Sequence, residues 1–222
     1  MKPAIHLPEA FTVTQEQFEQ LVWANRNVPM ERTAAGILII MSPTGGNTDR
    51  RNAGLTAQLW NWNQESELGE VFDSSTIFRL PNGADRSPDT AWVALERWQA
   101  LTPEEQDGFP PLCPDFVVEL RSKTDSLKEL QNKMQEYLEN GCRLGWLINP
   151  QNQQVEIYRP GQPVEILRSP QTLSGEDVLP GFAIELWKEE DPVQPPDNRS
   201  SWGHWRTDRQ NTPVGLEAIT HL

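Results

Sequence analysis

The stretch that decides the fold spans residues 113–150, CPDFVVELRSKTDSLKELQNKMQEYLENGCRLGWLINP. The run 116–120 is mostly apolar with two valines, which predicts a buried strand that ends in a charged turn. Leucines and other apolar residues then recur at helical spacing until Gly141, a residue type that commonly ends helices. A second apolar run at 144–148 predicts another buried strand. The stretch therefore predicts two core strands connected by a helix.

The first of these strands carries a carboxylate among apolar residues. Strand side chains alternate between two faces, so Glu119 shares a face with Asp115, Val117 and Arg121, opposite the face of Phe116. A carboxylate is costly to bury unless a cation pairs with it. Arg121 on the same face is one candidate partner and a metal ion is another. Glu119 is therefore either part of a functional site or half of a structural ion pair with Arg121.

The helix that follows has one apolar stripe and a lysine beside it. Asp125 or Ser126 is expected to cap its first turn. Lys133 lies about a quarter-turn off the stripe, next to Tyr137 one turn later. Its ammonium could turn toward the sheet, but an ordinary flanking lysine that extends to water is the interpretation that the residues alone favour. The stripe consists of Leu127, Leu130, Met134, Tyr137 and Leu138.

Length and composition indicate one globular domain with a polar tail. The 222 residues include 19 basic and 32 acidic side chains, a net charge of -13. This charge argues against non-specific adhesion to nucleic acid, although it leaves room for a local basic groove. No apolar run is long enough to span a membrane, and the N-terminal residues lack the apolar core of a signal peptide. The expected location is cytoplasmic, where Cys113 and Cys142 would be buried thiols.

The N-terminal half predicts two helices around one strand. Thr14 and Gln17 form a capping-box pattern at the start of a helix over 12–27. The strand at 37–41 is apolar on both faces, which predicts a central position in a sheet. A second helix is expected from Asn47 or Thr48 to about residue 66, with Leu55, Leu59 and Trp62 as its apolar stripe. Arg50 and Arg51 in its first turn are either exposed or face an anion such as a phosphate.

A hairpin and several short elements complete the prediction. The turn 81–83, Pro-Asn-Gly, should connect a strand over 71–80 to a return strand over 89–93. Asp89 enters this return strand much as Glu119 sits within its own. A short helix over 96–106, broken at 102–103, leads back to the central strand. The segment 154–158 alternates and predicts an edge strand, strands follow at 164–167 and 183–187, and residues 188–222 read as a polar tail.

Taken in order, these segments resemble the Uma2-family restriction endonucleases, once classed as a domain of unknown function. The likeness is carried by MSPTGG (41–46), SSTIFRLPNGADRSPDTAWV (74–93), PDFVVELRS (114–122), KMQEYLENG (133–141), LGWLINP (144–150), VEIYRP (155–160) and LPGF (179–182). The resemblance implies a domain over 1–187 with the PD-(D/E)XK nuclease fold. That fold is an α/β architecture with a restriction-endonuclease-like mixed central sheet flanked by helices.

The resemblance also implies roles for individual residues. Asp89 would be the aspartate of the PD element, and Glu119 the acidic residue of the E-x-K element. Arg121 stands where that element has its lysine, which is a departure from the pattern. Lys133 on the following helix, in a Lys-x-x-x-Tyr arrangement, is the natural replacement. Glu31 corresponds to an acidic position that helps to hold metal.

These roles imply Mg²⁺- or Mn²⁺-dependent hydrolysis of DNA. Phosphodiester hydrolysis needs a hard cation to neutralise developing charge and to lower the pKa of an attacking water. Arginine stays protonated in proteins, so Arg121 could stabilise charge but could not act as a base. The alternative is an inactive nuclease-fold protein that binds nucleic acid or a protein partner. Nucleases of this fold often act as dimers, so a homodimer is a further expectation.

Overall fold

The structure is a computed structural model that describes residues 11–41 and 45–187. The predicted tail, 188–222, lies outside these residues, as do the first ten positions and 42–44. The elements in chain order are α1 (Gln15–Ala24), β1 (Met30–Arg32), β2 (Leu38–Ile40), α2 (Gly46–Ser66), β3 (Gly69–Asp73), β4 (Phe78–Arg79), β5 (Asp85–Arg86), β6 (Thr90–Ala94), α3 (Leu95–Gln99), α4 (Pro103–Asp107), β7 (Phe116–Leu120), α5 (Leu127–Glu139), β8 (Leu144–Asn149), β9 (Gln154–Tyr158), β10 (Glu165–Arg168), β11 (Thr172–Ser174) and β12 (Ala183–Glu185).

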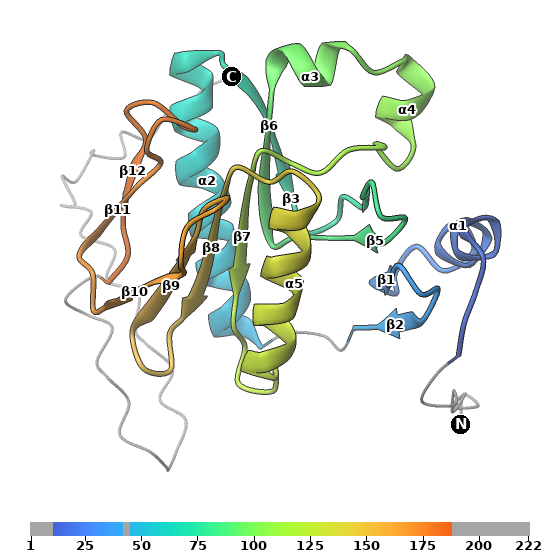
Figure 1. Cartoon of the computed structure of the whole chain (residues 1–222), viewed down its shortest axis with the longest axis horizontal. Helices are drawn as coiled ribbons and strands as arrows, with labels where there is room; N and C mark the ends of the chain where they lie inside the picture. Colours follow the sequence, from blue (N-terminus) through green and yellow to red (C-terminus); the bar gives the residue numbers. More distant parts are fainter. Residues whose placement is uncertain (1–10, 42–44, 188–222) are drawn as a thin grey trace, which may run out of the picture.

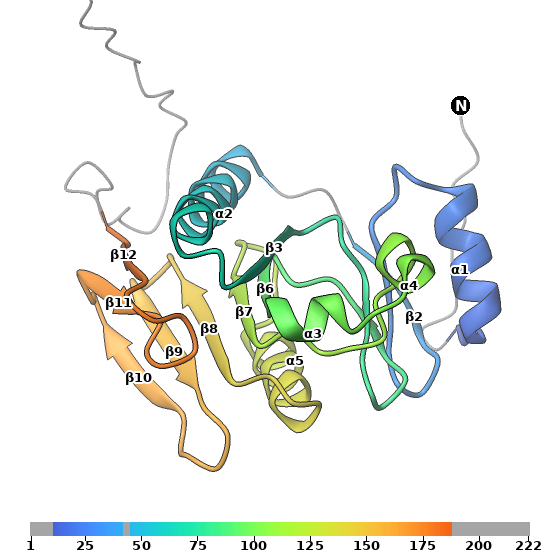
Figure 2. The same cartoon turned by 90° about the horizontal axis from the view of Figure 1, so that it is seen from above.

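A six-stranded sheet forms the centre of the molecule, in the order β10-β9-β8-β7-β6-β3. The β7–β8 pair is parallel and is connected through α5, whereas the other pairs are antiparallel. Helices α2 and α5 lie on opposite faces of this sheet (Figures 1 and 2). The predicted α/β architecture with a mixed central sheet flanked by helices is therefore confirmed.

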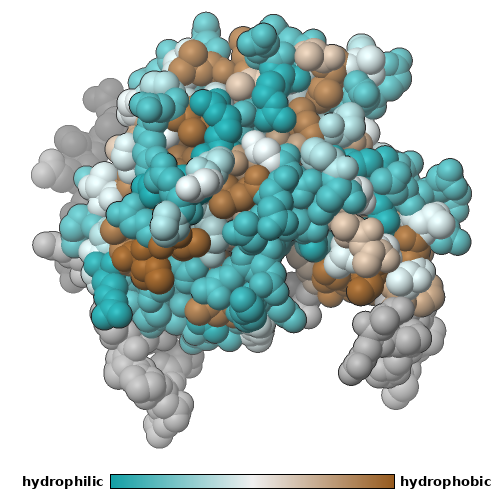
Figure 3. Space-filling view, viewed as in Figure 1, coloured by the Kyte–Doolittle hydropathy of each residue, from teal (hydrophilic) through white to brown (hydrophobic). Residues whose placement is uncertain are grey.

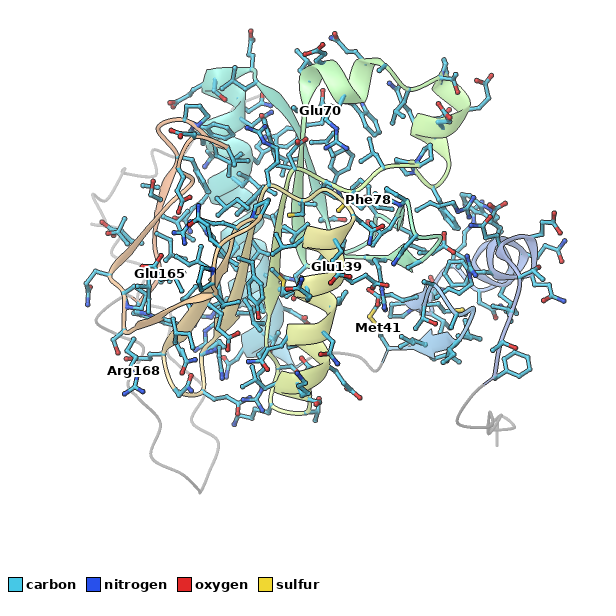
Figure 4. All side chains as sticks on the ribbon, in the orientation of Figure 1. Met41, Glu70, Phe78, Glu139, Glu165 and Arg168 are labelled. Carbon is cyan, nitrogen blue, oxygen red and sulfur yellow. The ribbon has the colours of Figure 1, made fainter. Side chains whose placement is uncertain are left out.

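The alternation of β7 divides the core into two layers. Phe116, Val118 and Leu120 belong to the cluster on the α2 side, whereas Val117 packs with Met134 of α5 on the other side. Phe78 of β4, labelled in Figure 4, is fully buried in the cluster that α5 covers. Glu119 has the same parity as Val117, so its side chain enters the layer between the sheet and α5.

Helix α5 forms where its periodicity predicts it. Ser126 is the N-cap, and its hydroxyl accepts a hydrogen bond of 3.4 Å from the Glu129 N–H. Gly141 follows the helix with φ 103°, a conformation that a residue with a Cβ adopts at a cost. Met134 and Tyr137 are fully buried against the sheet, so the predicted apolar stripe is confirmed.

Four strands form a second, smaller sheet in the order β2-β1-β5-β4. The turn at 81–83 connects β4 to β5 as an antiparallel hairpin, so the prediction of a turn is confirmed, but the return strand is β5 and not 89–93, which overlaps β6 and pairs with β3. The prediction of one strand over 71–80 is wrong, because a turn at Asp73 to Thr76 separates β3 from β4. The Asp73 carboxylate accepts from the Ser75 N–H at 2.9 Å and stabilises that turn.

Two predicted strand positions are also wrong. The apolar run at 37–41 gives β2, which is an edge strand with Ile40 half exposed, not a central one. Conversely β9 is not an edge strand, because β10 pairs with its outer side. Glu156 of β9 is nevertheless buried, since Gln131 and Tyr158 donate hydrogen bonds of 2.9 and 2.7 Å to its carboxylate. Strand β11, which pairs with β12, was not predicted.

A chain of ion pairs connects the small sheet to α1. The Asp85 carboxylate is fully buried and pairs with Arg32 at 2.8 Å and with Arg79 at 2.9 Å. Arg79 also pairs with Glu19 of α1 at 2.8 Å. Because each buried charge has an opposite charge in contact, this polar cluster tolerates burial. It holds β1 in the place from which Glu31 reaches the large sheet.

Two glycines offer a test of the packing around β3. A Cβ on Gly69 would lie 2.2 Å from the Val93 carbonyl oxygen and 2.4 Å from the Trp92 indole. We expect Gly69→Ala to lower the free energy of unfolding by about 1–3 kcal/mol through this overlap. Gly54 lies inside α2 with open space around it, so Gly54→Ala should raise the stability by about 0.5–1 kcal/mol. Urea unfolding of both variants checks this, and a tolerated Gly69→Ala would contradict the packing.

Candidate active site

The antiparallel pairing of β6 with β7 brings the two main predicted acidic residues together. Thr90 pairs with Val118, so Asp89, one residue before β6, lies opposite Glu119. Directly opposed residues of an antiparallel pair point to the same face with their Cβ atoms about 5 Å apart. The start of β6 and the end of β7 thus place two carboxylates side by side at one end of the sheet.

Glu119 is buried and held from α5. Its side chain is 5% exposed, and its Oε1 lies 2.8 Å from the Lys133 Nζ. The Tyr137 hydroxyl donates a hydrogen bond of 3.1 Å to the same oxygen. Lys133 and Tyr137 are one helical turn apart, so both side chains reach Glu119 from the same side of α5. The interpretation of Lys133 as a lysine that extends to water is therefore wrong, since its side chain is 12% exposed.

Asp89 is fixed by one backbone and one side-chain donor. The Leu120 N–H donates to its Oδ2 at 2.7 Å, and the Asn52 amide donates to its Oδ1 at 3.0 Å. The second contact comes from α2 on the opposite face of the sheet from α5. Three elements therefore meet at Asp89, namely α2, the start of β6 and the end of β7.

Glu31 enters the site from β1 of the small sheet and is 3% exposed. Its Oε1 lies 2.7 Å from the Lys133 Nζ and accepts from the Ser87 N–H at 2.9 Å. Its Oε2 accepts from Arg86 at 3.0 Å. The structure thus brings Glu31, Asp89, Glu119 and Lys133 together from both sheets and α5.

Arg121 is not part of this group. Its Nε donates to the Asp125 carbonyl oxygen at 3.2 Å, in the turn that leads to α5. Within the described residues the ion pairs of Glu119 include Lys133 and do not include Arg121. The structural ion pair between Glu119 and Arg121 that the sequence allowed does not form. Lys133 is the cation in contact with Glu119.

The pKa values of the site are set by the burial of each group and by the charges of its neighbours. Burial raises the pKa of Glu119 to about 8; the Asp89 and Glu31 charges act in the same direction, and the Lys133 ammonium offsets only part of the rise. Burial also raises the pKa of Asp89. Burial alone would raise the pKa of Glu31, but Lys133 and Arg86 more than offset it and lower that pKa. For Lys133, burial is outweighed by Glu119 and Glu31, which raise its pKa and keep it charged.

The carboxylate oxygens fit a hard divalent cation that keeps some of its waters. They do not form a site in which protein ligands fill every coordination position. Among the described residues, no group of three or more His, Cys, Asp or Glu side chains is arranged to hold a metal ion. Two carboxylates suffice for Mg²⁺, which usually keeps several of its waters. The hydrogen bonds of Glu119 use Oε1, and each Asp89 oxygen that accepts one bond retains a second lone pair. Asp89 and Glu119 are therefore the residues that fit such a cation.

The charge balance agrees with this fit. When every side chain of the cluster is ionised, it contains four carboxylates, from Glu31, Asp89, Glu119 and Glu136, and two cations, from Lys133 and Arg86. Two negative charges remain uncompensated, which is the charge of one divalent cation. Without such a cation, Glu119 binds a proton because its pKa is raised, and this proton neutralises part of the excess negative charge.

Several side chains of the site were not singled out by sequence reasoning. Arg86 bridges Glu31 and Glu136 at 3.0 and 2.6 Å, and Asn52 orients Asp89. Tyr137 was predicted only as a core residue and as the neighbour of Lys133. The charged run just before Pro88 was a signal for Arg86, whereas nothing in the sequence around Asn52 distinguishes it from other polar helix residues.

The face that carries α5 is mostly hydrophilic over the described residues, with hydrophobic residues in small separate groups (Figure 3). The ionic cluster therefore lies beneath a polar surface, not within an extended apolar one. None of the described helices combines the length and the apolar character needed to cross a membrane.

Comparison with known proteins assigns the family. The model of Uma2, described as "Putative restriction endonuclease", matches residues 15–186. The chain belongs to the Uma2 family. This range includes Glu31, Asp89, Glu119 and Lys133. The predicted resemblance is thereby confirmed, and the family supports a nuclease.

A solved structure shows the same fold. It is the crystal structure of "a putative nuclease belonging to DUF820" from Anabaena variabilis ATCC 29413, with a TM-score of 0.61. The two sequences are 19% identical, and the match covers 71% of this chain and 87% of the Anabaena chain. A search of the curated proteins found no match. At this identity the similarity establishes the fold of this Uma2 member and not its activity.

The raised pKa of Glu119 predicts a pH dependence of stability in metal-free buffer. Between the usual value of 4.5 and about 8, the folded state holds a proton that the unfolded state has lost. Raising the pH through this window should therefore destabilise the wild type by up to about 1.4 kcal/mol per pH unit. Glu119→Gln has no titrating group at this position. The free energy of unfolding of the variant minus that of the wild type should therefore increase from pH 5 to pH 8. Urea unfolding in EDTA tests it, and parallel pH profiles would contradict the raised pKa.

Proposed function

We propose that this Uma2 protein is a metal-dependent endonuclease that hydrolyses phosphodiester bonds in DNA. The observation that carries the proposal is the group formed by Asp89, Glu119 and Lys133 at one end of the central sheet. The Lys133 Nζ lies 2.8 Å from Glu119, and Asp89 lies opposite Glu119 in the β6–β7 register. The family and the nuclease-like structural neighbour support the same reaction class.

Asp89 and Glu119 would hold Mg²⁺ or Mn²⁺. When bound, such an ion neutralises charge on a phosphate and lowers the pKa of an attacking water. The protein's own contribution is to keep both carboxylates in place. The Leu120 N–H and the Asn52 amide orient Asp89, while Tyr137 fixes Glu119. Carboxylate positions set in this way require no rearrangement of the strands when a substrate arrives.

Lys133 is the cationic residue of the proposed site. Its raised pKa means that it stays protonated at neutral pH, so it would donate hydrogen bonds to the phosphate or to the attacking water. Arg121, at the lysine position of the strand motif, is turned toward the Asp125 carbonyl oxygen. We therefore assign the lysine role to Lys133 and an outer role to Arg121. A homodimer and a cytoplasmic location stay predictions.

The first test is metal binding followed by DNA cleavage. We expect Mn²⁺ calorimetry on the wild type to show binding that Asp89→Asn and Glu119→Gln each weaken at least about tenfold, since each removes a charged ligand. Plasmid cleavage by the same proteins should fall by roughly 10²-fold or more.

Glu156→Gln is the matched control for these variants. Glu156 is a buried glutamate that shares the Leu147 row of the sheet with Glu119, yet it lies on β9 and contacts Gln131 and Tyr158. It should keep both metal binding and cleavage. A wild type that binds DNA but neither binds Mn²⁺ nor cleaves would instead support the inactive, nucleic-acid-binding alternative.

A second test separates the two candidate cations. Lys133→Met should lower cleavage by roughly 10²-fold or more, because it removes the charge that contacts Glu119. Arg121→Gln should lower it by less than about tenfold, as expected of a cation outside the group. Initial rates on supercoiled plasmid measure both. The reverse order would return the lysine role to Arg121.

A further inference from the structure

Glu31 contacts two cations, whereas Glu119 contacts one and Asp89 is held by neutral donors. Both oxygens of Glu31 contact protein donors, namely the Ser87 N–H and Lys133 at Oε1 and Arg86 at Oε2. Its lowered pKa reflects these two cations and keeps it ionised. Two cations in contact with one carboxylate repel a further cation, so Glu31 is poorly placed to bind a metal ion. It is well placed to hold a cation of the protein.

The Lys133 ammonium has three N–H groups and three acceptors. They are Glu31 at 2.7 Å, Glu119 at 2.8 Å and the Ser87 carbonyl oxygen at 3.1 Å. These acceptors belong to β1 of the small sheet, β7 of the large sheet, and the segment that leads to Asp89. A long flexible side chain is thus fixed from three directions, and the small sheet supplies the shortest contact.

The small sheet also holds the helix that carries Lys133. Arg86 of β5 donates to Glu136 of α5 at 2.6 Å while it contacts Glu31. The Asn82 amide donates to Glu136 at 3.0 Å, and the Asn82 N–H donates to the Asn140 side chain at 2.7 Å. The position of Glu31 and the position of α5 are therefore set by the same strands.

Glu31 becomes more important once Glu119 binds a cation. A divalent ion at Asp89 and Glu119 would repel the neighbouring ammonium and compete with it for Glu119. Glu31 faces Lys133 from the other sheet, so its attraction does not depend on whether Glu119 is engaged. Removing it would leave Lys133 without a charged partner outside the proposed metal ligands.

We propose that Glu31 is a positioning residue that anchors the Lys133 ammonium from the small sheet, and that it is not a metal ligand. The mechanistic importance of this anchor rests on the proposed nuclease function, but the anchor itself does not. The small sheet thereby becomes part of the site, because it supplies one of the two carboxylates between which Lys133 lies.

The direct test is the NMR signal of the lysine side-chain nitrogen in the full chain, in EDTA. The chain has only five lysines, so selective ¹⁵N labelling gives few signals, and Lys133→Met assigns the one of interest. A buried ammonium with three acceptors should exchange its protons slowly and give a ¹⁵N–¹H cross-peak that exposed Lys128 does not give. We expect Glu31→Gln to remove or broaden this cross-peak, and Glu31→Asp, which keeps the charge, to retain it in part.

Glu129→Gln is the matched control, because Glu129 is an exposed glutamate on α5 that contributes no ion pair among the described residues. It should leave the cross-peak unchanged. Backbone amide spectra show whether each variant is folded. A folded Glu31→Gln protein with an unchanged Lys133 signal would overturn the inference, and so would a Glu31→Asp protein that loses the signal as completely as Glu31→Gln.

Metal binding and kinetics distinguish an anchor from a ligand. Glu31→Gln should change the Mn²⁺ affinity by less than about threefold, because Glu31 contacts Lys133 and neither Asp89 nor Glu119, whereas removal of a charged ligand would cost about tenfold or more. Its kcat for plasmid cleavage should fall about 10–100-fold with little change in KM, as expected when a catalytic group is displaced by a fraction of an ångström or more. A tenfold loss of Mn²⁺ affinity overturns the inference. A wild type without metal binding or cleavage overturns the nuclease proposal, while the NMR result still decides the anchor.

Discussion

The buried ammonium of Lys133 is the interaction on which the rest of the site depends. A cation in this position is tolerated only because Glu31, Glu119 and the Ser87 carbonyl oxygen accept its three protons. The two carboxylates depend on Lys133 in turn. Without the ammonium between them, ionised Glu31 and Glu119 would repel each other in the buried layer. Two sheets and α5 therefore meet at one nitrogen atom. Displacement of either sheet or of α5 would leave a buried charge without its partner.

The second constraint is the antiparallel register of β6 and β7. It places Asp89 opposite Glu119 and lets the Leu120 N–H orient the aspartate at 2.7 Å. Asn52 adds a contact from α2, so Asp89 is held from the face of the sheet that α5 does not cover. Glu119, with burial and neighbouring negative charge acting on it, has a pKa of about 8. A cation that bound there would have to displace a proton, which would link its affinity to pH.

The local pattern of the chain was a good guide where side-chain periodicity is strong. Periodicity predicted α5, its apolar stripe and the face of β7 from which Glu119 projects, because side chains return to the same face at a fixed interval along a helix or strand. It failed for β2 and β9. An apolar run indicates burial but does not say which strands lie alongside, and Ile40 remains half exposed at a sheet edge. The alternation of 154–158 indicated an edge strand, yet β10 pairs with β9, and Gln131 and Tyr158 donate hydrogen bonds to the buried Glu156 carboxylate.

The sequence by itself determined the strand-helix-strand centre, the face on which Glu119 lies and, through its ordered motifs, the Uma2 family. Only the tertiary structure decided which charges meet. It turned Lys133 inward, turned Arg121 toward the Asp125 carbonyl, and brought Glu31 from another sheet to the same nitrogen atom. The physical reason is that periodicity acts over a few residues, whereas the cost of burying a charge is settled by whichever opposite charge the fold brings within about 3 Å.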